Sequence, residues 1–316
     1  MFLKLEDLEN RSMVTEFLLL GFSVPSEVKE ALFAAFLLVY LLTLLGNLLI
    51  TALIVISTNL HTPMYFFLFN VSCLDIGSAS FTVPRMLVGL LVARNYIPFK
   101  ECIAQVFGFA FLGVTEVFLL TAMCYDRYVA ICLPLSYSVI MSGRFCILLL
   151  TISLLAGFLM SLVYTLQASR LPFCGDTVID NFVCDFPNLL KLACADPLAN
   201  QILLFALTGS VALITFLVII TSYVHIIRVI LKIPSTEGRR KVFSTCSAHL
   251  VVLAMFYGTG AATHLKPSSI SLGHEKLASL FYTVFAPMLN PIIYSLRNEE
   301  VKKAARKVMH RRQRAL

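Results

Sequence analysis

Two acidic residues stand in the middle of long apolar stretches of the sequence. Asp75 follows LHTPMYFFLFNVSCL, and Glu116 lies within VFGFAFLGVTEVFLLTAM. A charged side chain at membrane depth is costly, and such residues commonly mark ion sites, proton relays or switches. With Asn47 and Asn290, from two other apolar stretches, they could form one polar cluster that holds a sodium ion, water or a proton. The alternative is a purely structural network, because buried polar groups also fix the register of helices.

The triplet Asp126-Arg127-Tyr128 ends the third apolar stretch and could act as a switch. A guanidinium at the end of a helix can pair with the neighbouring carboxylate in one state and reach a protein partner in another. Tyr223 and His249 stand at a similar depth in two other stretches and could compete for Arg127. A lone histidine in an apolar segment is more often structural, so these residues alone leave the role of His249 open.

The nine cysteines divide into two groups by position. Four stand in or beside one set of polar connections, and four cysteines in an oxidising compartment allow two disulfides in three pairings. Tying the middle of the long segment 168–197 to the start of the third stretch would drape it over the bundle, which favours Cys102–Cys184 and leaves Cys174–Cys194. We interpret the other five as small buried apolar residues: Cys73, Cys124, Cys132, Cys146 and Cys246.

Motifs that would indicate an enzyme are missing from the sequence. There is no glycine-rich phosphate loop, no nucleophile elbow and no pair of cysteines at zinc spacing. His274-Glu275 begins like a zinc motif, but Ala278 stands where the second histidine is needed. We therefore expect neither enzyme activity nor a zinc site. A transporter could use Asp75 and Glu116 as a proton relay, but we find no inverted repeat or glycine-broken span.

The apolar stretches themselves indicate a membrane protein. Of the 316 residues, 59% are hydrophobic and 14% are charged, whereas soluble domains are roughly half apolar and a quarter charged. A hydrocarbon core about 30 Å thick needs about 20 apolar residues of helix, and membrane strands would show short alternating segments instead. The sequence predicts an all-α fold of seven transmembrane helices, at about 29–56, 62–87, 99–132, 144–167, 198–231, 240–265 and 273–296.

Basic residues set the orientation, because they favour cytoplasmic segments. They gather after the fifth stretch and in the tail from Arg297 to Arg314. We therefore expect the C-terminus inside and, after seven crossings, the N-terminus outside, where Asn10-Arg11-Ser12 is an N-glycosylation sequon. The net charge of +7 lies in juxtamembrane segments, which indicates anionic lipid and an acidic protein partner rather than nucleic acid.

These assignments divide a multi-pass protein of the plasma membrane into three parts. Residues 1–28 form an extracellular N-terminus, residues 29–296 form the seven-transmembrane domain, and residues 297–316 form a cytoplasmic basic tail. The tail predicts a short amphipathic helix that lies on the inner membrane surface.

Six motifs occur in the order in which olfactory receptors carry them. They are Gly46-Asn47, LHTPMYFFLFNVSCLD (60–75), MCYDRYVAICLPLSY (123–137), Ser222-Tyr223, KVFSTCSAHL (241–250) and PMLNPIIYSLRN (287–298). On these motifs the chain resembles, over essentially its whole length, the olfactory receptors, a branch of the rhodopsin-like G-protein-coupled receptors. Three loop cysteines at intervals of ten residues, with FYG at 256–258, resemble the terrestrial-vertebrate class.

The resemblance implies a ligand chamber among the outer halves of spans three, five, six and seven, capped by the disulfide-tied loop. Phe109 matches the position where amine receptors carry an acidic anchor, so we do not expect a protonated amine ligand. Thr208 and His264 are the expected polar contacts in a mostly apolar lining. The matching positions are Phe109, Gly113, Val114, Leu207, Thr208, Tyr257, Gly260, Ala261, His264, Leu280 and Thr283.

The switch implied by the resemblance departs from the wider rhodopsin-like pattern. The chain has no tryptophan, and Tyr257 stands where most relatives carry a toggle tryptophan in span six. Basic residues surround Arg239, where some relatives carry an acidic partner for the span-three arginine. Arg127, Tyr223 and His249 are therefore the better switch candidates. We assign five further residues to the same switch: Asp126, Tyr128, Asn290, Pro291 and Tyr294.

These features together predict an odorant receptor. It would bind a small, volatile, mostly apolar ligand and activate a stimulatory heterotrimeric G protein of the olfactory type, which raises cAMP. The alternatives are a non-olfactory rhodopsin-like receptor for another small metabolite and a membrane transporter. We expect no cofactor except a possible sodium ion at Asp75 and Glu116.

Overall fold

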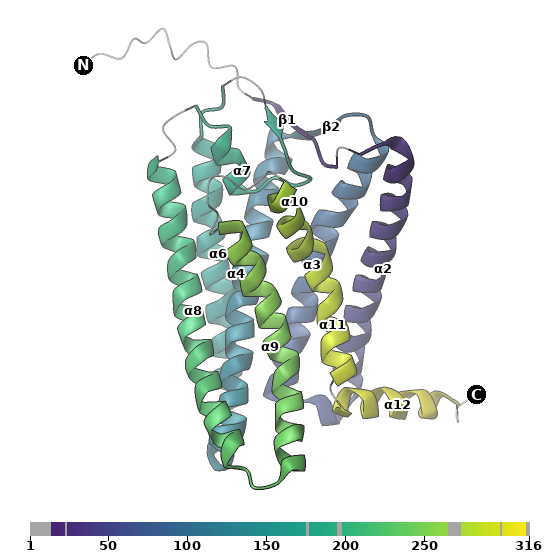
Figure 1. The fold of residues 1–316 in the computed structure, drawn as a ribbon, viewed down its shortest axis with the longest axis vertical. Coiled ribbons are helices and arrows are strands. Elements are labelled where there is room, and N and C mark those ends of the chain that lie inside the picture. The colour runs from purple at the N-terminus through teal and green to yellow at the C-terminus, as the bar shows by residue number, and fades with distance from the viewer. Residues whose placement is uncertain are drawn as a thin grey trace.

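The protein is a bundle of long helices that run side by side (Figure 1). The computed structural model describes residues 14–22, 24–174, 177–194, 198–264, 273–297 and 299–313. The long helices are α2 (Ser26–Ile56), α3 (Pro63–Leu91), α4 (Phe99–Cys132), α6 (Gly143–Arg170), α8 (Leu198–Lys232), α9 (Thr236–His264) and a last rod built from α10 (Gly273–Leu280), the π-helix η3 (Phe281–Phe285) and α11 (Ala286–Arg297). The predicted all-α bundle of seven rods is confirmed.

Apolar residues on the outside of the bundle identify its solvent as lipid. Within the described residues, α2, α3, α4, α6 and α8 are long and apolar enough to cross a membrane, and α9 contains a shorter apolar run, His249–Gly258. Leu41 and Leu45 of α2 and Leu213 of α8 are each more than half exposed. Large aliphatic side chains exposed in such numbers would be unfavourable in water, and they match hydrocarbon.

The last rod is divided into α10, η3 and α11, whereas the sequence predicted one continuous span at about 273–296. Pro287 has no N–H to donate to the carbonyl of Thr283, and its ring crowds that carbonyl. The π-helix Phe281–Phe285 widens the turn directly before this proline. Such π segments occur mostly as single turns, frequently at functional sites. The wide turn packs against α2, α3 and α9.

A small sheet at one end of the bundle was not predicted, so the all-α description is incomplete there. Strand β1 (Glu16–Leu19) pairs antiparallel with β2 (Asn95–Pro98) and parallel with β3 (Val178–Ile179). Phe17 and Leu19 are buried while Glu16 is exposed, which is the alternation of a half-buried strand. The segment before α2 is thereby fastened to two connections of the bundle.

Two disulfides hold the long connection between α6 and α8 across the same end. Cys102 at the start of α4 bonds to Cys184, and Cys174 bonds to Cys194, which is the pairing that the sequence analysis favoured. The backbone N–H of Cys184 also donates to Gln105 at 2.9 Å. A short helix, α7 (Phe186–Lys191), follows, and its Phe186 and Leu189 are buried against α4 and α6.

The opposite end carries three short helices and the tail. The helices η1 (Thr58–Leu60), η2 (Pro134–Ser136) and α5 (Tyr137–Ile140) lie in the connections, and α12 (Glu299–Gln313) turns away from the bundle axis (Figure 1). Val301 and Ala304 of α12 are buried in the core cluster at this end, while Glu300 is exposed. One face of α12 is thus apolar and the other polar, as an interfacial helix requires.

Candidate ligand chamber and inner switch

Asp75 and Glu116 lie close together in the centre of the bundle. The side-chain amide of Asn290 donates to both carboxylate oxygens of Asp75 at 3.1 Å, and Glu116 Oε1 is 3.5 Å from the same nitrogen. Asp75 is 1% exposed and Glu116 is 7% exposed. Two buried carboxyl groups that share one amide donor repel each other when both are charged. The arrangement therefore suits a proton or a cation between them.

Asn47 is not hydrogen-bonded to these three residues, unlike in the predicted cluster of four. Its side-chain amide donates to the carbonyls of Thr43 and Pro287, both at 3.0 Å. The bond to Pro287 joins α2 to α11 directly after the π-helix. A Cβ on the preceding Gly46 would lie 3.1 Å from Pro291, so the glycine allows the two helices to approach closely. Gly46 and Asn47 therefore both contact α11, the helix that contains Pro287 and Pro291.

Asp126 holds two groups at the end of α4. Its Oδ1 accepts a hydrogen bond from the hydroxyl of Tyr137 at 2.8 Å, and its Oδ2 lies 3.6 Å from the Arg127 guanidinium. Arg127 Nε also donates to the sulfur of Met64 at 3.3 Å. Partial burial, with the neighbouring Asp126 carboxylate, raises the pKa of Tyr137, so the phenol remains protonated and can donate. Arg127 is thus retained by its own helix and by α3.

Tyr223 and His249 contact each other, whereas we expected them to compete for Arg127. The Tyr223 hydroxyl lies 3.0 Å from Nδ1 of His249, and the Cys124 sulfur lies 3.6 Å from the same nitrogen. All three residues are buried and come from α8, α9 and α4. Cys124 precedes Arg127 by three residues, or about 4.5 Å along the helix. The Tyr223–His249 pair therefore lies about one turn deeper than Arg127.

The remaining switch candidates lie near this pair. Tyr294 of α11 is buried, and its hydroxyl has no hydrogen-bond partner among the described residues. Tyr128 stacks edge-to-face on His225 of α8, with ring centroids 5.7 Å apart. Pro291 packs on Gly46 as described above. The switch candidates thus lie on α4, α8, α9 and α11, and Pro291 contacts α2 through Gly46.

The expected chamber residues pack in separate parts of the bundle. Phe109 and Leu280 pack in a cluster with α2, α3 and η3, while Leu207 packs with Cys102, Cys184 and α7 beneath the disulfide-tied connection. Tyr257 packs against the inner core. Val114 is half-buried on α4, and Thr283 is buried, with its hydroxyl donating to Ser279. At Gly260, Ala261 and His264 the structure describes only the course of the backbone. Asn10 lies outside the described residues.

Two pairs of hydroxyl groups join neighbouring helices. The Tyr164 hydroxyl lies 2.8 Å from that of Thr208, and Tyr257 donates to Thr215 at 2.6 Å. A hydroxyl has one hydrogen and two acceptor sites, so each pair can still bind a further polar group. Thr208 was expected as a polar contact, but Tyr164 and Thr215 were missed because apolar spacing does not distinguish them from ordinary packing residues.

Tyr282 of the π-helix closes the space beside Gly113. A Cβ on Gly113 would lie 2.5 Å from the Tyr282 hydroxyl, so any larger residue would displace this tyrosine from its present position. The Tyr282 ring also stands edge-to-face with Phe256, at 5.3 Å between centroids. Gly113 was expected as a lining residue, whereas the phenol of Tyr282 covers it. Tyr282 could not be singled out from the sequence, because nothing in it predicts the π-helix that contains this residue.

Most of the chain matches one family model. The model described as "Olfactory receptor" matches residues 36–312. The chain belongs to the olfactory receptor family. Human "Olfactory receptor 8H3" is 48% identical over 96% of this chain and 97% of its own length. Mouse "Olfactory receptor 5AP2" is 48% identical over 96% of both chains.

This olfactory receptor also shares its fold with a solved structure. The crystal structure of squid rhodopsin superimposes with a TM-score of 0.69 and covers 91% of this chain and 87% of that one, at 16% sequence identity. The family and the rhodopsin fold confirm the resemblance drawn from the six motifs. The receptor is a membrane-spanning odorant receptor that acts through G proteins, and it is not an enzyme.

Proposed function

We propose that this receptor binds a small, volatile, mostly apolar ligand in the outer half of its bundle, under the disulfide-tied connection. The main support is the chemistry of the described chamber positions. They carry phenylalanine, leucine, valine and glycine, with hydroxyls from Thr208, Tyr257 and Thr283 as polar groups. Such a lining suits an uncharged ligand with one or two hydrogen-bonding atoms. His264, at the end of α9, is proposed as a further contact.

The proposed partner at the other end is a stimulatory heterotrimeric G protein of the olfactory type. Arg127 is held by Asp126 and Met64 in this arrangement. A ligand that prefers another arrangement of α8 and α9 shifts the population towards it. Arg127 then leaves Asp126 and contacts the G protein, and cAMP rises.

We also propose the orientation that this partner requires, in the plasma membrane. The basic tail and α12 lie at the inner surface among anionic lipid. The sheet, the two disulfides and Asn10, as a glycosylation site, lie outside. Disulfides form in the oxidising compartment through which outer segments pass, so their place at the sheet end supports this orientation.

We further propose that Asp75 and Glu116 bind a sodium ion or share a proton. Carboxylate oxygens are ligands that hard cations accept, and Asp75 and Glu116 both direct carboxylate oxygens at the same Asn290 nitrogen. A bound cation offsets the repulsion between the two buried carboxylates. Loss of the cation would restore this repulsion and so destabilise the packing of α3, α4 and α11 around the two carboxylates.

The function is tested by measuring cAMP in cells that express the receptor while volatile ligands are applied. We expect concentration-dependent cAMP responses to some volatile apolar compounds and none to peptides. Responses restricted to polar metabolites would instead favour a non-olfactory receptor of the same fold. Uptake of a labelled compound without any cAMP response would support a transporter and overturn the proposal.

A further inference from the structure

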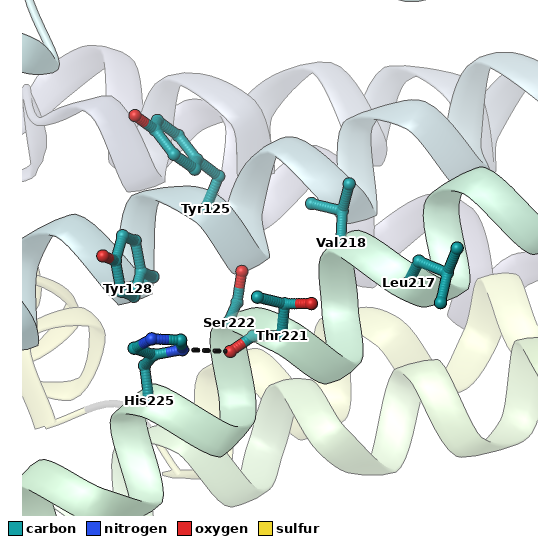
Figure 2. A pocket seen from close by; sticks show the side chains of 7 residues that line it. All are labelled: Tyr125, Tyr128, Leu217, Val218, Thr221, Ser222 and His225. Atoms are coloured by element: carbon teal, nitrogen blue, oxygen red, sulfur yellow. Dashed lines mark hydrogen bonds between the residues drawn. The ribbon is translucent and has the colours of Figure 1, made fainter.

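A cavity opens on the membrane-facing side of the bundle, away from the proposed odorant chamber. It lies between α4 and α8, towards the ends that carry Arg127 and Lys232, and encloses about 350 Å³ (Figure 2). Cavities of about 300–1,000 Å³ are of the size that holds small molecules. Its lining residues are Tyr125, Tyr128, Leu217, Val218, Thr221, Ser222 and His225.

The cavity opens to the bilayer rather than to the interior of the bundle. Leu217 is 55% exposed and Val218 is 39% exposed, and both lie on the outer surface of α8. Thr221 and His225 are exposed as well. At this depth the surrounding medium is hydrocarbon, so a molecule that enters the cavity comes from the membrane.

The lining changes from apolar to polar along the cavity. Leu217 and His225 are eight residues apart, or about 12 Å along α8, and Figure 2 shows Leu217 at one end and His225 with Tyr128 at the other. His225 is seven residues from the end of α8 at Lys232, which places the polar end about 10 Å from the helix terminus. A molecule with one polar end would therefore lie with that end towards the cytosolic surface.

The hydrogen bonds at the polar end define what the occupant must offer. Nδ1 of His225 lies 2.9 Å from the carbonyl of Thr221 (Figure 2). Since a carbonyl can only accept, Nδ1 donates to it, and in that tautomer Nε2 accepts a hydrogen bond. The hydroxyls of Tyr128 and Ser222 add groups that donate or accept. An alcohol group matches this set because it both donates and accepts.

The charge of the lining selects against phospholipid. None of the seven lining residues carries a carboxylate, an ammonium or a guanidinium group, so the lining offers a phosphate no permanently charged partner. Arg228 lies one turn nearer the cytosol, outside the lining. A rigid apolar body loses less conformational freedom on binding than two acyl chains do. The favoured occupant is thus an uncharged, rigid lipid with one hydroxyl group.

We propose that this cavity is a binding site for a membrane sterol. The sterol hydroxyl donates to His225 Nε2, and its ring system lies along Val218 and Leu217 between α4 and α8. The site borders the inner switch, because Tyr128 follows Arg127 and Ser222 precedes Tyr223 in the sequence. It is independent of the odorant chamber and does not rest on the proposed ligand.

The absence of tryptophan from the chain allows a direct test. A Leu217→Trp variant carries a single tryptophan in the cavity, and an Ile220→Trp variant carries one on a lipid-exposed face of the same helix outside the lining. Each purified full-length variant is placed in phosphatidylcholine nanodiscs with rising fractions of a dibrominated sterol. Quenching of tryptophan fluorescence by bromine then reports how often the sterol contacts the tryptophan at position 217 or 220. A brominated phosphatidylcholine serves as the second probe.

We expect saturable quenching of Leu217→Trp at low sterol fractions and gradual quenching of Ile220→Trp that follows the bulk lipid. Adding His225→Leu should return the Leu217→Trp curve to the bulk form. The proposal would be overturned if the brominated sterol quenched both tryptophans with the same concentration dependence. It would also be overturned if the brominated phosphatidylcholine, and not the sterol, gave saturable quenching of Leu217→Trp. Because tryptophan itself could fill the cavity, the unmodified receptor is also labelled with a diazirine sterol. Label on the lining segments of α4 and α8 supports the site, and label elsewhere only would contradict it.

Discussion

The hydroxyl of Tyr223 lies 3.0 Å from Nδ1 of His249, and this contact joins α8 to α9 about one helical turn deeper than Arg127. Both side chains are buried, so the bond is made without competition from water. We take it as a contact that holds the two helices in the arrangement seen here, in which Arg127 pairs with Asp126.

Removing this contact should raise basal signalling. A net hydrogen bond contributes about 1 kcal/mol, so Tyr223→Phe should increase ligand-free cAMP about fivefold if the bond is specific to the resting arrangement. Tyr40→Phe is the matched control, because it removes a hydroxyl that bonds to Ser80 at an exposed site. Equal basal cAMP in both variants would show that the contact does not restrain activation.

Tyr137 should restrain Arg127 through Asp126. Tyr137→Phe removes the donor to Asp126 Oδ1 and leaves a buried acceptor, at a cost of about 1–3 kcal/mol. We expect Tyr137→Phe to have a lower thermal unfolding temperature and higher basal cAMP than the native receptor. Tyr96→Phe, on strand β2, is the control. If neither quantity changes, the contact does not position Asp126.

The pH dependence of this contact has a definite sign. The pKa of Tyr137 is raised, mainly by burial and then by Asp126, so the stabilisation is complete below the ordinary tyrosine pKa of about 10. It is lost only as the pH rises through the raised value. The stability difference between the native receptor and Tyr137→Phe should therefore stay constant from pH 6 to about pH 9. A difference that shrinks within this range would contradict the assignment.

The two central carboxylates should make stability depend on sodium. If a cation binds between Asp75 and Glu116, replacing choline chloride with sodium chloride should raise the unfolding temperature of the purified receptor, and Asp75→Asn should abolish the effect. Glu101→Gln is the control, since Glu101 is exposed at the outer end of α4. An equal sodium effect in Asp75→Asn would show that the ion binds elsewhere. If sodium has no effect on the native receptor, the two carboxyl groups share a proton and do not bind sodium.

A side chain at position 113 should destabilise the receptor as long as Tyr282 keeps its hydroxyl, because the two groups would overlap. Overpacking costs about 1–3 kcal/mol, so Gly113→Ala should reduce thermal stability and ligand potency. Gly258→Ala is the control, because a Cβ there meets no atom within 4 Å. Adding Tyr282→Phe to Gly113→Ala should restore both quantities. Failure of this rescue would mean that the glycine is needed for another reason.

Patterns that repeat along one helix were predictable from the sequence. The expected span 99–132 coincides with α4 (Phe99–Cys132), because its apolar run ends at polar residues and a proline on both sides. The disulfide pairing followed from the need to order one long connection. These features depend on local composition and on chain connectivity, which a single sequence carries.

Features that depend on how helices meet were not predictable. Asn47 bonds to the Pro287 carbonyl rather than to Asp75, because that carbonyl is presented by the divided last rod. Tyr282 reaches Gly113 only because the π-helix turns it towards α4. Cys124 was interpreted as an inert apolar residue, yet its sulfur contacts His249. Each of these contacts joins residues more than 100 positions apart, and no spacing along the chain indicates it.

In the proposed mechanism, ligand binding in the outer half releases Arg127 to a G protein at the inner face. The most direct test of this mechanism is ligand-evoked cAMP in cells that express Arg127→Ala, compared with the native receptor and with Arg144→Ala, which removes an exposed arginine at the start of α6. The account predicts that Arg127→Ala reaches the cell surface normally but gives no cAMP response to an active odorant, while Arg144→Ala responds like the native receptor. A full response from Arg127→Ala would contradict it.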